Sequence, residues 1–255
     1  MAIIHSILLI GQSNAGGRGF VSEAPALDIE NSLVLRNGRW RQAYRPLNPD
    51  RVTSGVCFAE SFAVCYRDAH PGVQVGVIPC ADGGTQLMQW QKGSLLYDHA
   101  VNCARLAQRT SHIVAVLWHQ GESDCYDDRC PLHNERLSAI IDGFRADLGL
   151  EDVPFLVGGL GDYLQEFKGG NTVWSNNYRT INASLRQIAE SKPHMGFVSA
   201  EGLTSNPDYM HFTAESLLEF GRRYYRVFDT LEDKTRTFAE KTTMDAAIRG
   251  ELESL

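Results

Sequence analysis

The sequence predicts an α/β protein in which a parallel sheet of about five strands lies between two layers of helices. Short apolar runs alternate with amphipathic segments along most of the 255 residues, a pattern typical of a parallel sheet covered on both faces. Motifs rich in glycine or polar residues follow three of the apolar runs, and ligands bind beyond the carboxyl ends of such strands. A composition of 43% hydrophobic and 22% charged residues allows one sizeable core.

Each element is placed by the spacing of its apolar residues. We expect strands at residues 3–10, 32–36, 73–79, 112–118, 154–159 and 195–199. We expect helices at residues 58–69, 95–109, 132–147, 174–191 and 213–229. Residues 161–177 mix glycine, aromatic and polar side chains over a length unusual for a strand-to-helix connection, so we expect this segment to wall a ligand pocket.

One domain is expected at residues 1–230, followed by a charged extension at residues 231–255. The extension has weak helical spacing of its apolar residues, so a helix packed on the domain or on a second subunit and a frayed tail are equal expectations. A homo-oligomer therefore stays open as an alternative.

Charge and hydropathy exclude several classes of partner. The net charge of -7 and the absence of a Lys/Arg cluster argue against nucleic-acid binding. No apolar stretch approaches the roughly 20 residues of a membrane-spanning helix. Because no basic segment precedes residues 3–10, we interpret this run as a strand rather than a signal peptide. We therefore expect a cytoplasmic protein.

The six cysteines are expected to be free thiols, because a chain of this size needs no disulfide framework. Only Cys125 and Cys130 are expected in loops, where they would pair if the protein were exported. Metal binding near His119 is not favoured, since the acidic, histidine and cysteine residues there match neither Cys-x-x-Cys nor His-Glu-x-x-His spacing. No metal or other cofactor is expected.

Ser13 is the candidate nucleophile, because it lies in Gly11-Gln12-Ser13-Asn14 directly after the first expected strand. A hydroxyl needs a base to take its proton and donors to hold the oxyanion that forms. Such a serine would otherwise only shape a turn.

His211 is the candidate base. Asp208 lies three residues before it and is close enough in sequence to fix the imidazole tautomer, and Glu122 is a second acidic candidate for the same task. The alternative for Glu122 is a buried carboxylate that orders its loop without touching His211. His119 is expected to pack or hydrogen-bond locally.

Three groups are candidates for the oxyanion hole: the backbone N–H of Ser13, an N–H of Gly83-Gly84, and the side-chain amide of Gln120. A phosphate loop is a weak rival reading, because Gly17 and Arg18 stand where Lys and Ser or Thr are required. An α/β-hydrolase elbow is disfavoured because Ala15 replaces the second glycine of Gly-x-Ser-x-Gly.

These motifs together resemble the successive blocks of the SGNH-type hydrolases, in the right order over residues 3–220. The residues that carry the resemblance form four blocks: Gly11–Asn14 with residues 16–19, residues 78–85 with Trp90, Trp118–Asp124, and Asp208–His211. The resemblance is closest to the sialate O-acetylesterase and acetylxylan esterase branch, carbohydrate esterase family 6.

The resemblance implies a flavodoxin-like three-layer α/β/α sandwich, no cofactor, and hydrolysis of carbohydrate O-acetyl esters through an acetyl-serine intermediate. It implies Ser13 as nucleophile, His211 as base, Asp208 as its partner, and Glu122 in the same role. Within Gly83-Gly84 we favour Gly84 as the oxyanion donor, and Gln120 stands where the wider group has asparagine.

Substrate contacts are expected from residues in or beside these blocks: Gln12, Asn14, Arg18, Thr85 and Trp90. Trp90 is the best candidate to face a sugar ring, although large aromatic residues more often pack in cores. Arg18 would anchor a carboxylate or pair with an acid of the protein.

The sequence thus predicts a serine esterase that removes acetyl groups from a xylan-type oligosaccharide or from sialic acid. One alternative is an esterase or thioesterase for a non-carbohydrate ester, which would use the same residues. The other is a catalytically silent carbohydrate-binding module, which predicts a broken triad, whereas the serine, the histidine and both acids are present.

Overall fold

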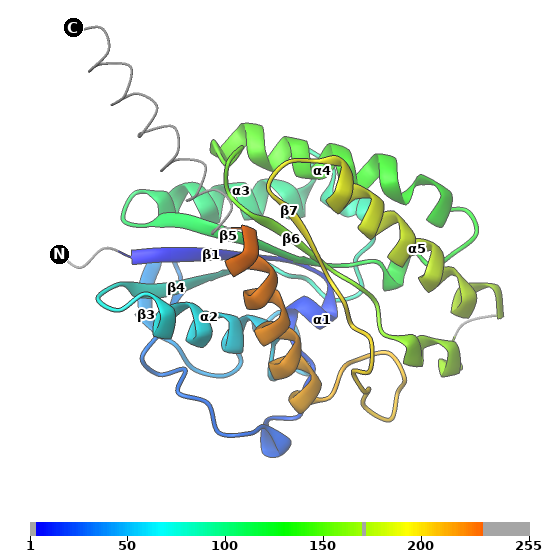
Figure 1. The fold of residues 1–255 in the computed structure, drawn as a ribbon, viewed down its shortest axis with the longest axis horizontal. Coiled ribbons are helices and arrows are strands. Elements are labelled where there is room, and N and C mark those ends of the chain that lie inside the picture. The colour runs from blue at the N-terminus through cyan, green and yellow to red at the C-terminus, as the bar shows by residue number, and fades with distance from the viewer. Residues whose placement is uncertain (1–3, 170–171, 232–255) are drawn as a thin grey trace, which may run out of the picture.

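The central element is a seven-stranded sheet with strand order β3-β2-β4-β1-β5-β6-β7 (Figure 1). The structure, a computed structural model, describes residues 4–169 and 172–231, and only the backbone of residues 172–175. The strands are β1 Ile4–Gly11, β2 Leu33–Arg36, β3 Arg39–Gln42, β4 Gln74–Pro79, β5 His112–His119, β6 Phe155–Gly158 and β7 Met195–Val198. Every neighbouring pair is parallel except the β2–β3 hairpin.

Helices cover both faces of the sheet, so the predicted three-layer α/β/α sandwich is confirmed (Figure 1). They are α1 Ser13–Gly16, α2 Phe58–Ala69, α3 Leu95–Gln108, α4 His133–Leu148, α5 Thr172–Ser191 and a helix at residues 214–231. Short 3-10 turns are η1 Val21–Glu23, η2 Leu87–Trp90, η3 Glu122–Asp124, η4 Cys130–Leu132 and η5 Asp162–Glu166.

The alternation of side chains along β1 divides the core in two. Leu8 and Ile10 face the cluster formed with α3, α4 and α5, whereas Ile7 and Leu9 face the cluster formed with α2 and the helix at residues 214–231. Because both faces of β1 are buried, its sequence is a continuous apolar run, as expected for a central parallel strand.

The sheet is wider than the expected five strands because a hairpin extends one edge. Strands β4-β1-β5-β6-β7 have the flavodoxin-like order, and β2 and β3 continue the sheet beyond β4. Strand β3 was not predicted. Its hairpin turns at Asn37 and Gly38, whose φ values are 48° and 72°, and Asn-Gly between two short runs is a hairpin signal that sequence reading could have used.

The order of the central strands gathers the motif loops at one edge of the sheet. Strand β1 lies between β4 and β5, so the segments that follow Gly11, Pro79 and His119 are neighbours. Gly11 has φ 127°, and a Cβ there would lie 2.1 Å from the carbonyl oxygen of His119. Glycine therefore lets the end of β1 approach β5 closely enough to place the next residues beside the β5 loop.

Three further expectations concern the chain as a whole. None of the described helices combines the length and the hydropathy that crossing a bilayer requires. All six cysteines are free thiols. The predicted extension lies, beyond Leu231, outside the described residues, so the domain boundary and the helical tail stay predictions.

Candidate active site

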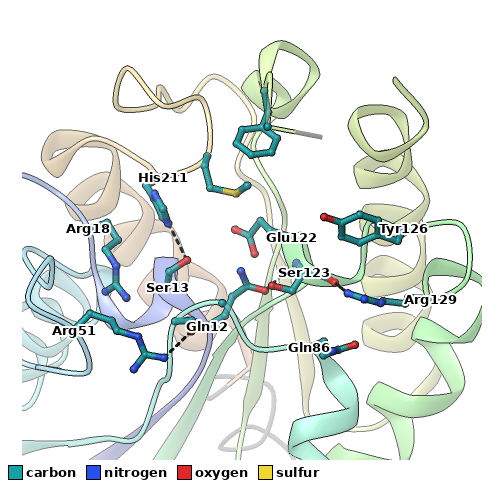
Figure 2. Close-up of a pocket in the computed structure, with 15 residues that line it drawn as sticks. Gln12, Ser13, Arg18, Arg51, Gln86, Glu122, Ser123, Tyr126, Arg129 and His211 are labelled. Carbon is teal, nitrogen blue, oxygen red and sulfur yellow. Dashed lines mark hydrogen bonds between the residues drawn. The ribbon is translucent and has the colours of Figure 1, made fainter. Parts of the chain in front are cut away.

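Ser13, His211 and Asp208 form a continuous hydrogen-bonded chain at the carboxyl edge of the sheet. Ser13 begins α1 directly after β1, and its Oγ lies 3.0 Å from Nε2 of His211 (Figure 2). Nδ1 of His211 lies 2.6 Å from Oδ2 of Asp208. Because a carboxylate only accepts hydrogen bonds, Nδ1 carries the proton and Nε2 presents its lone pair to the serine hydroxyl.

Asp208 is held in place by its own loop. Its Oδ1 accepts the backbone N–H groups of Met210 and His211 at 2.9 and 3.0 Å. Burial would raise the pKa of Asp208, but the hydrogen bonds from the side chain and backbone of His211 and from Met210 outweigh it and lower the pKa to about 2. The carboxyl group is therefore ionised at neutral pH.

Glu122 is buried beside the cavity, and its position differs from that of an acid partner of His211. Its Oε1 accepts a 2.6 Å hydrogen bond from Nδ2 of Asn14 and lies 3.7 Å from Nδ1 of His119. Both ring nitrogens of His211 are already engaged by Ser13 and Asp208. The structure therefore brings Asp208, and not Glu122, to the imidazole.

Asn14 does not reach the cavity, so the expectation that it contacts substrate is wrong. It is fully buried, and besides Glu122 its Nδ2 donates to the carbonyl oxygen of Met210 at 3.1 Å. Its Oδ1 accepts the N–H of Phe212 at 3.1 Å. Asn14 thus ties the loop that carries His211 to α1 and to Glu122.

Gly83 and Gly84 differ in what their N–H groups bind. The N–H of Gly83 donates to Oδ2 of Asp50 at 2.8 Å. Within the described part of the chain, the N–H groups of Gly84 and Ser13 donate to no protein acceptor, and both residues line the cavity. This geometry favours Gly84 over Gly83 as a donor to an oxyanion at Ser13.

Gln120 is turned away from the cavity, which corrects its assignment to the oxyanion hole. Its side chain is fully buried, and its Nε2 donates to the carbonyl oxygen of Thr85 at 3.2 Å and to the carboxylate of Asp124. Asp124 also accepts the N–H of Leu87. Both amide hydrogens therefore have acceptors within the protein, and the bond to Thr85 joins the loop after β5 to the loop after β4.

Thr85 and Trp90 belong to the same buried network, so neither is a substrate contact. Trp90 is fully buried, donates from Nε1 to Oγ1 of Thr85 at 3.0 Å, and packs edge-on against Trp118 at 5.6 Å between ring centroids. A sugar ring has no access to its face. The sequence could not reveal this, because core and rim aromatics look alike in a motif.

Arg18 lines the cavity but is paired with an acid of the protein, the second of its two expected roles. Its guanidinium binds both oxygens of Asp50, at 3.1 and 2.7 Å. Burial would raise the pKa of Asp50, but the hydrogen bond and charge of Arg18 outweigh it and lower the pKa. Because Asp50 also accepts the N–H of Gly83, this ion pair positions the glycine loop against Ser13.

Gln12 lines the cavity with a fixed orientation. Its Oε1 accepts the backbone N–H groups of Gly121 at 3.4 Å and Ser123 at 3.2 Å. The amide nitrogen therefore points the other way, and no protein acceptor for it exists among the described residues. Figure 2 shows this amide between Ser13 and Ser123.

The cavity over Ser13 has a volume of about 480 Å³, within the usual range of sites for small molecules. Sequence reasoning missed several residues that line it: Arg51, Gln86, Ser123, Tyr126, Arg129, Phe167, Gly169 and Met210. Phe167 and Gly169 come from the segment that was expected to wall the pocket. Ser123 and Met210 lie inside the motifs Trp118–Asp124 and Asp208–His211. Only the fold brings the rest to the site: Arg51, Gln86, Tyr126 and Arg129.

His119 lies in the core and hydrogen-bonds locally, as its sequence context predicts. His119 is fully buried, and its Nε2 donates to the carbonyl oxygen of Gly159 at 3.2 Å. Burial lowers the pKa of His119. Within the described ranges, the acidic and cysteine residues around it bring no three ligand atoms within 4.8 Å of one another.

Comparisons with known proteins identify the family and the fold. Residues 4–230 match the family model described as carbohydrate esterase, sialic acid-specific acetylesterase. A probable carbohydrate esterase of Arabidopsis thaliana is 29% identical over 236 residues, 84% of this chain and 86% of the plant protein. The X-ray structure of that Arabidopsis protein superposes with a TM-score of 0.77 at 25% identity, covering 89% of this chain and 98% of the other. The crystal structure of NanS superposes with a TM-score of 0.73 at 16% identity, covering 91% and 98%, and supports the fold alone.

Proposed function

Because the chain belongs to the carbohydrate esterase, sialic acid-specific acetylesterase family, and is therefore a carboxylic ester hydrolase, we propose that it removes O-acetyl groups from sugars through an acetyl-serine intermediate. The observation that carries the serine mechanism is the 3.0 Å contact between Ser13 Oγ and His211 Nε2, with Asp208 on the other ring nitrogen.

In the first half-reaction, Oγ of Ser13 attacks the acetyl carbonyl carbon as its proton passes to Nε2 of His211. The negative charge that develops on the carbonyl oxygen is held by the N–H groups of Ser13 and Gly84. When the carbon–oxygen bond to the sugar breaks, His211 returns its proton to the leaving alkoxide. The products are a free sugar hydroxyl and acetyl-Ser13.

In the second half-reaction, water attacks the acetyl-enzyme and gives its proton to His211. The tetrahedral intermediate collapses, acetate leaves, and the proton returns to Ser13. Gln12 supplies the side-chain donor that had been expected from Gln120, because its amide nitrogen faces the cavity and its oxygen is fixed by two backbone N–H groups.

The acidic sugar is the preferred substrate class within this proposal. The guanidinium groups of Arg51 and Arg129 line the cavity at its rim, together with Arg18 inside it. Arg51 pairs with Asp82 at 2.7 Å but is half exposed, so a substrate carboxylate can share it. An O-acetylated sialic acid carries such a carboxylate, and an acetylated xylo-oligosaccharide does not.

The mechanism is tested by hydrolysis of p-nitrophenyl acetate with wild type, Ser13→Ala and Ser123→Ala. Ser123 lines the same cavity and is the matched control. We expect Ser13→Ala to abolish the activity, Ser123→Ala to retain it, and an acid-quenched wild-type reaction to carry an acetyl group on the peptide that contains Ser13. Equal loss in both variants, with circular dichroism unchanged, would contradict the assignment.

The substrate class is tested by comparing Arg51→Gln with Arg41→Gln, a change at an exposed arginine of β3. We expect Arg51→Gln to raise KM for an O-acetylated sialic acid about tenfold, in line with the loss of one charge-assisted contact, and to leave KM for an acetylated xylo-oligosaccharide unchanged. A higher kcat/KM for the neutral sugar in the wild type would refute the preference.

A further inference from the structure

A second cluster of chemically reactive side chains lies away from the cavity over Ser13. Cys80 directly follows β4, and His99 and Cys103 lie on α3. Their ligand atoms all lie within 4.8 Å of one another, and Sγ of Cys103 is 3.7 Å from Nε2 of His99. Among the described residues, no other group of three or more His, Cys, Asp or Glu side chains meets this condition.

The fold explains why the side chains of Cys80, His99 and Cys103 lie close together. His99 and Cys103 are four residues apart on one helix, so their side chains lie one above the other on the same face. That face is turned toward the end of β4, where Cys80 is buried in the core cluster and Cys103 packs against it. The burial decreases outward, from buried Cys80 through half-buried Cys103 to exposed His99.

We propose that Cys80, His99 and Cys103 bind a thiophilic divalent cation, Zn²⁺, with water in the fourth position. Zinc bonds of about 2.3 Å to sulfur and about 2.0 Å to nitrogen give ligand separations of about 3.5–3.8 Å in a tetrahedron. The distance of 3.7 Å between Sγ of Cys103 and Nε2 of His99 already lies in this range. The other two pairs of ligand atoms lie within 4.8 Å, so each needs to approach by at most about 1.3 Å.

The ion and its water have a route to the site. A cavity of about 300 Å³, separate from the one over Ser13, is lined by Cys80 and His99. Its lining also includes the carboxylate-bearing residues Asp50 and Asp82. Three protein ligands with an open fourth position is the arrangement of zinc sites that keep a bound water.

The site would anchor the loop that carries the oxyanion glycines. The N–H of Cys80 donates to the carbonyl oxygen of Leu9 in β1, and the next residue, Ala81, donates to Oδ1 of Asn48. Gly83 and Gly84 follow within four residues. None of the three proposed ligands lines the cavity over Ser13, so the ion acts on the loop and takes no part in the acyl transfer.

The test uses the purified full-length protein, reduced and stripped of metal. Zn²⁺ is titrated calorimetrically, and Co²⁺ is added as a spectroscopic probe, since thiolate-to-cobalt charge transfer absorbs in the near ultraviolet. We expect one equivalent of each metal to bind to wild type. We expect His99→Ala and Cys103→Ser to weaken binding by at least 10- to 100-fold, because that is the usual loss when only a hydrogen-bond partner of a metal ligand is removed. His99 is exposed, so its replacement leaves the core intact.

Matched controls are His112→Ala, another exposed histidine, and Cys65→Ser, another half-buried helical cysteine. Both should bind metal as wild type does. A hundredfold excess of Zn²⁺ over Kd should raise the Tm of wild type by about 5–10 °C and leave that of His99→Ala unchanged. This readout needs no esterase activity, so it stands apart from the proposed acyl transfer.

Two outcomes would overturn the proposal. One is no stoichiometric binding of Zn²⁺ to the reduced wild type. The other is equal binding by wild type, His99→Ala and Cys103→Ser, which would place the metal elsewhere.

Discussion

Replacement of Asp208 by asparagine tests the assignment of the acid in the triad. Asparagine keeps the shape of the side chain but turns one acceptor oxygen into an NH₂ donor. Because Oδ1 accepts the N–H groups of Met210 and His211, the NH₂ group falls opposite Nδ1 of His211. A donor there selects the tautomer with its proton on Nε2, which can no longer accept the proton of Ser13.

The size of the effect follows from the exposure of the pair. In a buried serine triad, the wrong tautomer lowers kcat by about 10⁴-fold. The side chain of Asp208 is 46% exposed, so water competes for the imidazole and weakens the selection of the tautomer. We therefore expect kcat to fall by about 10²- to 10⁴-fold with KM unchanged, because only the transfer of the proton is impaired.

The matched variant is Glu122→Gln, which keeps the volume of a buried side chain on the other side of the site. Glu122 touches Asn14 and not the ring nitrogens of His211, so we expect it to lower kcat/KM by about tenfold or less. The assay is initial-rate hydrolysis of p-nitrophenyl acetate by both variants. If Glu122→Gln loses more activity than Asp208→Asn, the acid has been assigned to the wrong residue.

Three further predictions follow from the same contacts. Gly83→Ala would place a Cβ 2.4 Å from Nη2 of Arg18, so it should displace the loop that carries Gly84. We expect kcat to fall by about 10²-fold, as it does when an oxyanion donor is lost. An unchanged kcat would show that the position of this loop does not matter for catalysis. Asp50→Asn leaves the buried guanidinium of Arg18 without its charge partner and should lower the free energy of unfolding, measured in urea, by about 3–5 kcal/mol, whereas a loss below about 1 kcal/mol would make the pair dispensable. The pKa of Asp208 is about 2 in the folded chain and about 3.9 in the unfolded chain, so its contribution to stability is complete above about pH 4 and is lost as the pH falls toward 2. The free energy of unfolding in urea should therefore depend on pH differently in wild type and Asp208→Asn only in that window. Parallel curves for the two proteins would contradict this prediction.

The secondary structure could be predicted closely, because apolar spacing is strong in buried parallel strands and amphipathic helices. The expected helix at residues 58–69 has the bounds of α2, and the expected strand at residues 73–79 differs from β4 by one residue. Strand β3 was missed because Arg39–Gln42 is a short strand at the sheet edge in which Trp40 is the one apolar residue. Edge strands lack the periodic burial on which such predictions depend.

The residues of the proposed triad could be selected from the sequence, because each follows a strand end or precedes a helix. Ser13 follows β1, and His211 lies just before the helix at residues 214–231. The contacts of Gln120, Thr85 and Trp90 could not be predicted from the sequence. A motif shows which residues stand together in the chain, whereas the direction of each side chain depends on packing between loops from different strands.

The arrangement of these buried polar side chains explains why so many motif residues surround so few reacting atoms. Gln120 joins the loop after β5 to Thr85 in the loop after β4, and Asn14 joins Glu122 to the loop that carries His211. A loop left to its own backbone would hold its groups loosely, and a misplacement of 1 Å costs about 10²-fold in rate. Hydrogen bonds inside the protein are strong where water is excluded, and a buried donor without an acceptor costs about 1–3 kcal/mol. The motif residues that do not touch substrate therefore fix the distances between Ser13 and the groups around it.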